Sequence, residues 1–294
     1  MILVPEEPAL PDVQRASAPL ALRFEDVAQD GRVLLDALPA GIGTAVWGEL
    51  LSKHPMTEMA RRDGVISILN RLVVTGERGP IAPTRSIRVH GCYDLAHTVD
   101  ANGEVDRILL LAWARFEGPI GHLIGKTPRD GEMVEIGRLY AEHVFTRPFG
   151  PPDARKVRRL DHPGLPQVPE RRVTWRTAEE ILAPPANASP LEPAPAEDAP
   201  VVFGTGHTDE NQHVNSLVYP RRFEEGVLRR LATLGRSSAV LPRGVEIAYR
   251  KPFFAGDRAT LALQTFGTAG GVLATGSFGA KGRPHAVLRM SFEP

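Results

Sequence analysis

Seven side chains that can form hydrogen bonds or move protons fall within nine residues, between positions 207 and 215. They are His207, Asp209, Glu210, Asn211, Gln212, His213 and Asn215. A carboxylate such as Asp209 can act as a general base or as a nucleophile. His213 can relay a proton near neutral pH, and Asn211 can position a water or a substrate carbonyl. This stretch is therefore the strongest candidate for a catalytic site.

A purely structural role for these residues is that they cap a helix. The sequence becomes apolar and helix-like after the stretch, and Asn215 or Ser216 is a suitable N-cap. Capping needs one such residue and seven polar groups are present, so a functional role is favoured. The positive end of that helix would stabilise a developing oxyanion. Pro220 is tolerated only in a first helical turn, so the helix either starts near Tyr219 or is kinked there.

The same stretch resembles the signature of a known family. Residues 209–216, "DENQHVNS", are similar to the Asp-x-Asn-x-His-Val-Asn motif of hotdog-fold thioesterases. That family includes the acyl-ACP thioesterases and the 4-hydroxybenzoyl-CoA thioesterase-like enzymes. Tyr219 and Phe223-Glu224-Glu225 follow the motif, and "VEIAYRKPFFAGD" resembles the family's next strand. The resemblance covers residues 201–294, and the first half of the chain resembles the family only in its order of elements.

The resemblance implies an α+β double-hotdog chain, in which each half wraps a curved antiparallel sheet around a helix. The two halves would form a pseudo-dimer with the active site near their interface. The implied activity is hydrolysis of acyl-CoA or acyl-ACP thioesters, with CoA or acyl carrier protein as the carrier and with no metal or cofactor. The implied catalytic residues are Asp209, Asn211 and His213, and the implied substrate-binding residues are Asn215, Ser216 and Tyr219.

Two departures from the family pattern limit what is carried over. Plant acyl-ACP enzymes have an acidic residue and a cysteine after Tyr-Arg-Arg, where this chain has Pro252 and Phe253. The first half has no such motif, and Asp36 is the only acid in "LLDALPAGIGTAVW" before its helix. We therefore expect one site per chain. A hotdog hydratase or dehydratase and a non-catalytic acyl-thioester-binding protein remain alternatives, although no hydratase-type Asp and His pair is found.

Proline-rich segments divide the chain into four parts. We expect a loose arm at 1–19, a first structured unit at 20–158, a linker at 159–200 with one ordered turn at 174–182, and a second unit at 201–294. Each unit should contain a helix followed by antiparallel strands, and the two sheets could pair edge to edge. One helix is predicted at 44–62, and a second is predicted from the end of the polar stretch to about residue 234. Strands are predicted at 64–74, 84–99, 105–118, 133–145, 200–206, 244–253, 257–267, 271–280 and 284–292.

The composition argues against several other classes of protein. Lys plus Arg and Asp plus Glu each number 35, which gives no reason to propose a nucleic-acid or membrane partner. Cys92 is the only cysteine, so an intramolecular disulfide and a cysteine metal cage are excluded. The N-terminus lacks the basic start of a signal peptide, and no segment reaches the roughly 18 apolar residues of a membrane span. We expect a cytoplasmic protein and leave open a homodimer of such chains.

Overall fold

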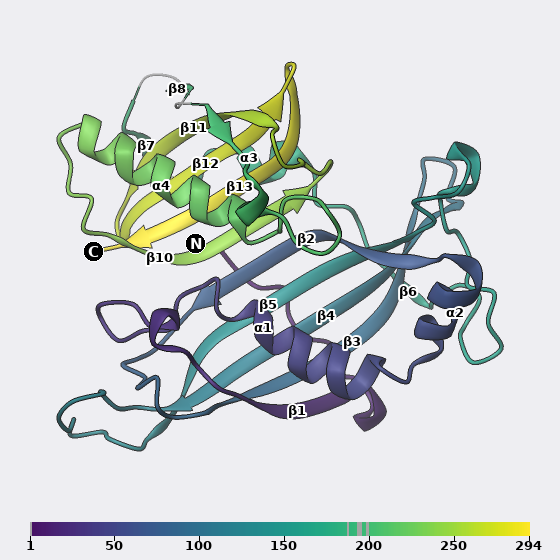
Figure 1. Cartoon of the computed structure of the whole chain (residues 1–294), viewed down its shortest axis with the longest axis horizontal. Helices are drawn as coiled ribbons and strands as arrows, with labels where there is room; N and C mark the ends of the chain where they lie inside the picture. The colour runs from purple at the N-terminus through teal and green to yellow at the C-terminus, as the bar shows by residue number, and fades with distance from the viewer. Residues whose placement is uncertain (1, 187, 193–195, 198–199) are drawn as a thin grey trace. The chain divides into compact units, whose positions relative to one another are not determined.

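The computed structural model describes residues 2–186, 188–192, 196–197 and 200–294. These residues form two compact units (Figure 1). The N-terminal unit comprises Val4–Leu72 and Gly76–Trp175, and the C-terminal unit comprises Arg176–Pro294 with residues 2–3 and 73–75. The division falls at Trp175, inside the predicted linker. Each unit places helical segments against an antiparallel sheet, which is the predicted α+β class.

The C-terminal unit is built on four long strands and one long helix. The strands are β10 (Leu241–Tyr249), β11 (Arg258–Thr268), β12 (Gly271–Ala280) and β13 (Arg283–Glu293), in the spatial order β10-β13-β12-β11. They agree with the prediction to within a few residues, because buried and half-buried positions alternate along strands such as β11. β10 ends at Tyr249, ahead of Pro252, which has no N–H for a sheet.

Helix α4 (Val218–Thr233) lies along this sheet (Figure 1). Tyr219, Phe223, Val227 and Leu231 recur every four residues and are all buried, so they form one apolar stripe against the strands. Gly276 of β12 allows the close approach. A Cβ at that position would lie 2.8 Å from the Phe223 ring and 2.3 Å from the Ala262 carbonyl oxygen.

Residues of the predicted linker pair with strands of each unit. In the C-terminal unit, β7 (Ser189–Pro190), β8 (Ala196–Glu197) and β9 (Val201–Val202) each pair with β11. Helix α3 (Ala178–Leu182) is the ordered turn expected there, and it packs against Ala248 and Val287. In the N-terminal unit, β6 (Arg171–Arg172) runs parallel to β3. These short strands depend on pairing with β3 and β11, so the composition of the linker alone did not predict them.

The long strands of the N-terminal unit follow the order β1-β3-β4-β5-β2, and the short β6 pairs with β3 beside them. The strands are β1 (Arg15–Leu20), β2 (Ile66–Gly76), β3 (Ile87–Val99), β4 (Val105–Pro119) and β5 (Met133–Thr146). Strands β2 to β5 match the prediction. Short 3₁₀ turns are η1 (Asp12–Gln14), η2 (Phe24–Asp26), η4 (Pro152–Ala154) and η5 (Thr205–His207). Among the described residues, no helix is long and apolar enough to cross a membrane.

The single helix predicted at 44–62 is wrong in detail. The structure has a short α1 (Pro39–Gly41), a π-helix η3 (Ile42–Leu51) and a separate α2 (Pro55–Asp63). The break lies at His54, which is extended (φ −76°, ψ 147°) because the residue before a proline avoids helical geometry. Gly91 of β3 lets η3 approach the sheet closely, since a Cβ there would lie 2.9 Å from the Val46 side chain.

The prediction of a loose arm at 1–19 is also wrong for the last residues of that segment. Residues from Arg15 onward form β1, which pairs antiparallel with β3, Arg15 opposite Cys92 and Leu20 opposite Ile87. The preceding residues are held in place by Trp113 Nε1, which donates to the Pro5 carbonyl at 3.1 Å. Pro19 fits in β1 because an edge strand has one side that needs no N–H donor.

Candidate active site

The predicted catalytic residues lie on one tight hairpin-like loop before helix α4. The Asp209 amide donates to the His213 carbonyl at 3.2 Å, and the Gln212 amide donates to the Asp209 carbonyl at 2.9 Å. Gln212 adopts a left-handed conformation (φ 65°) that reverses the chain. Thr208 bridges Val214, and His213 bridges Phe254. The loop is therefore fixed at its base and bound to the chain that follows β10.

The Asp209 carboxylate is half-buried and oriented by two hydrogen bonds. Its Oδ1 accepts from the Asn211 backbone amide at 3.0 Å, and its Oδ2 accepts from Asn215 Nδ2 at 3.1 Å. Neither donor is a cation, so the charge of the carboxylate is not neutralised by these bonds. Asp209 is thus held in one orientation as an acceptor that can take a proton.

Asn215 connects this carboxylate to the start of helix α4. Its Oδ1 accepts from the Leu217 amide at 2.9 Å, and its carbonyl accepts from the Val218 amide at 3.0 Å. The helix begins at Val218, so Pro220 lies in the first turn, where its missing N–H costs no helical bond. Of the two alternatives that the sequence left open, a helix start near Tyr219 and a kink at that point, the structure shows the first.

Asn211 and His213 project from the same loop. The Asn211 side chain is exposed and the His213 side chain is half-buried. Within the described part of the chain, no hydrogen bond or ion pair involves the Asn211 carboxamide or the His213 imidazole. Both groups are therefore available to a bound molecule, unlike the Asn215 amide, which is committed to Asp209.

Ser216 and Tyr219 hold the loop on the core of the unit. The Ser216 carbonyl accepts from Tyr249 Oη at 3.0 Å, and Tyr219 Oη accepts from the Phe253 amide at 3.3 Å. Burial raises the pKa of both tyrosines, so both hydroxyls stay protonated. Tyr219 is only 2% exposed. Its place is beneath the loop, and contact of Ser216 or Tyr219 with a substrate stays a prediction.

Phe253, one of the two positions that depart from the family pattern, has a packing role here. Phe253 is buried, and its carbonyl accepts from the Val214 amide at 2.7 Å, which anchors the loop. Its ring stacks on His285 of β13, with centroids 4.2 Å apart. Nothing in the sequence near the motif indicates His285, because it comes from a distant strand. The contact between His207 Nε2 and Arg222 Nη2, at 2.8 Å, was likewise not predicted.

Comparisons with known proteins give matches among solved structures alone. No protein-family model and no curated protein sequence matches the chain. A Lactobacillus plantarum protein named provisionally as an oleoyl thioesterase aligns with a TM-score of 0.65, at 13% identity over 95% of this chain and 96% of that one. An acyl-ACP thioesterase from Bacteroides thetaiotaomicron aligns with a TM-score of 0.60, at 13% identity over 95% and 98%.

A third structure, the 12:0-ACP thioesterase of Umbellularia californica, aligns with a TM-score of 0.54, at 15% identity over 97% of this chain and 99% of that one. All three alignments span nearly the whole of both chains, and many of the structural neighbours are hotdog proteins with two units in one chain. At this level of identity the similarity establishes the fold. The chain therefore has the predicted double-hotdog fold.

Proposed function

We propose that the protein hydrolyses acyl thioesters to a free acid and a thiol. The observation that carries the proposal is the loop at Asp209. A half-buried carboxylate is oriented by Asn211 and Asn215, and an available carboxamide and imidazole project from the same loop. The loop leads directly into helix α4. Base, water-positioning groups and a helix N-terminus are the parts that thioester hydrolysis requires.

Asp209 is the group that starts the reaction. As a general base it takes a proton from water while the water oxygen attacks the thioester carbonyl carbon. As a nucleophile its oxygen attacks that carbon directly, and water then cleaves the resulting anhydride. In either case the C–S bond breaks, and a proton from the site or from solvent reaches the thiolate. Asn211 and His213 position the water, and His213 can pass on the proton.

The backbone amides of Leu217 and Val218, at the start of helix α4, do not bind the oxyanion directly. Asn215 already accepts from the Leu217 and Val218 amides, so those two donors are occupied. Pro220 supplies no N–H. We therefore assign stabilisation of the oxyanion to the positive end of the helix dipole, which acts without a direct bond from these two amides, while Asn211 positions the water.

The carrier of the acyl group is CoA or acyl carrier protein. Two of the structural neighbours are named as acyl-ACP thioesterases, which supports acyl-ACP as the first substrate to test. We place the protein in the cytoplasm, where both carriers occur. Pairing of two chains into a homodimer stays a prediction.

A panel of acyl-CoA and acyl-ACP thioesters tests this function. Free thiol release is followed for the native protein, for Asp209→Ala and for Glu210→Gln, which removes an exposed acid from the same loop. We expect release by the native protein and by Glu210→Gln, and almost none by Asp209→Ala. Tight acyl-CoA binding without release from any substrate would instead identify a binding protein. Release that survives in Asp209→Ala would refute the assignment of Asp209.

A further inference from the structure

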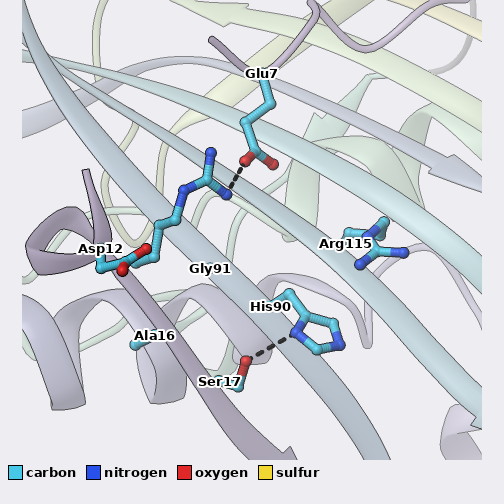
Figure 2. Close-up of a pocket in the computed structure, with 8 residues that line it drawn as sticks. Glu7, Asp12, Ala16, Ser17, His90, Gly91 and Arg115 are labelled. Atoms are coloured by element: carbon cyan, nitrogen blue, oxygen red, sulfur yellow. Dashed lines mark hydrogen bonds and ion pairs between the residues drawn. The ribbon is translucent and has the colours of Figure 1, made fainter. Parts of the chain in front are cut away.

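Three polar side chains on adjacent strands of the N-terminal unit form a continuous hydrogen-bonded chain. Ser17 Oγ lies 2.8 Å from His90 Nδ1, and His90 Nε2 lies 3.2 Å from Glu117 Oε2. Figure 2 shows the first of these contacts. Ser17 is on β1, His90 on β3 and Glu117 on β4. A serine bonded to one nitrogen of a histidine, with a carboxylate on the other, is the arrangement of a nucleophilic triad.

The strand register produces this arrangement. Ser17 lies directly opposite His90, and Glu117 lies opposite Arg88, one row along the same face as His90. Side chains on one face of neighbouring strands are within contact distance. The His90 ring therefore reaches Ser17 on one side and Glu117 on the other.

The hydrogen bonds fix the protonation that the chemistry needs. When Nε2–H donates to the Glu117 carboxylate, Nδ1 is left as an acceptor for the Ser17 hydroxyl proton. Arg115 Nη1 donates to the other Glu117 oxygen at 2.5 Å, which holds the carboxylate toward the imidazole. The ring nitrogens are used in the reverse order from the serine-protease triad, but the roles of base and orienting acid are the same.

A cavity of about 420 Å³ opens beside Ser17 and His90 (Figure 2). The paired residues Ala16 and Gly91 also line it. The ion pair of Glu7 with Arg15, together with Asp12 and Arg115, completes the lining. None of these described lining residues has a large apolar side chain, so the cavity suits a small polar molecule and not a long acyl chain. Ser17 itself is exposed and accessible.

We propose that Ser17, His90 and Glu117 form a second, independent nucleophilic site that cleaves short polar esters. Ser17 Oγ attacks the ester carbonyl carbon as its proton passes to His90 Nδ1. The ester C–O bond breaks, the departing alcohol takes that proton, and the acyl group stays on Ser17. Water, activated by His90, then releases the acid. Arg115 also lines the cavity, and its N–H groups besides the one that bonds Glu117 are the donors that we assign to the developing oxyanion.

Labelling with a fluorophosphonate, followed by peptide mapping, tests the site in full-length Asp209→Ala protein, in which the thioesterase site is disabled. Displacement of fluoride by Ser17 Oγ should label Ser17 at least tenfold faster than the exposed Ser238. The variants His90→Gln and Glu117→Gln should each slow this labelling by tenfold or more. A native circular-dichroism spectrum of each variant is the control for folding.

The hydrolysis of p-nitrophenyl acetate gives a second readout on the same proteins. We expect turnover in Asp209→Ala that is lost on adding Ser17→Ala. Labelling of Ser17 no faster than Ser238, or a rate unaffected by His90→Gln, would show that the three side chains only tie strand β1 to the sheet. Because the Asp209→Ala background already lacks the thioesterase base, failure of the Ser17 proposal leaves the thioesterase proposal intact. Failure of the thioesterase proposal likewise leaves the Ser17 proposal intact.

Discussion

Replacing His143 with glutamine should make the N-terminal unit less sensitive to acid. His143 lies on β5, is only 8% exposed, and meets the Trp47 ring of η3 edge-on at 5.5 Å. Its Nδ1 has no hydrogen-bond partner among the described residues. Burial lowers the pKa of His143 from 6.5 to about 4, and a bond with the Leu110 backbone offsets only part of that shift.

The size of the effect follows from the two pKa values. The unfolded chain binds a proton at His143 near pH 6.5 and the folded chain only near pH 4. The contribution of neutral His143 to the free energy of unfolding is therefore fully present above pH 6.5. It falls as the pH drops toward 4, because the unfolded state then binds more protons than the folded state. With these values the loss is about 2 kcal/mol at pH 5 and about 3 kcal/mol below pH 4.

Urea unfolding at pH 7 and pH 5 measures this loss. The three tryptophans, Trp47, Trp113 and Trp175, all belong to the N-terminal unit, so their fluorescence reports that unit alone. The native protein should lose about 2 kcal/mol more than His143→Gln between the two pH values. The exposed His122, replaced by glutamine, is the control and should behave like the native protein. Equal losses in the native protein and His143→Gln would refute the reasoning.

Two further predictions concern packing in each unit. Gly276→Ala should destabilise the C-terminal unit by about 1–3 kcal/mol, because its Cβ would collide with the Ala262 carbonyl and the Phe223 ring; an unchanged urea midpoint by circular dichroism would contradict this. Burial raises the pKa of the Cys92 thiol to about 12, so Cys92 should react with a disulfide reagent at pH 8 only as the chain unfolds. Immediate reaction of the native protein would show that the thiol is accessible.

The strands were predictable because their signal is local. Alternating apolar residues fix the period of a strand such as β11, whichever neighbours it pairs with. The helix at 44–62 was predicted too simply, because a single Pro55 breaks it and the π-helical geometry of η3 leaves no mark in its composition. Strand β1 was missed because its order comes from pairing with β3, which is distant in the sequence.

For the candidate site, the sequence predicted the position of the loop but not the hydrogen bonds that hold it. The motif located Asp209, Asn211 and His213 on one loop, since all three lie within five residues. The bond from Asn215 to Asp209 depends on the left-handed turn at Gln212, which sequence spacing does not specify. The anchoring of the loop by Phe253 depends on contacts across the fold.

The rate of thiol release by Asp209→Asn tests the central claim most directly. Asparagine keeps the size of the side chain and one acceptor oxygen for the Asn211 amide, but its NH2 group replaces the oxygen that accepts from Asn215 Nδ2, so the base and that bond are lost together. We predict that kcat/KM falls by about 10²–10⁴-fold with a circular-dichroism spectrum like that of the native protein, and that Glu210→Gln stays within about twofold. A kcat/KM for Asp209→Asn within about tenfold of the native value would contradict the account.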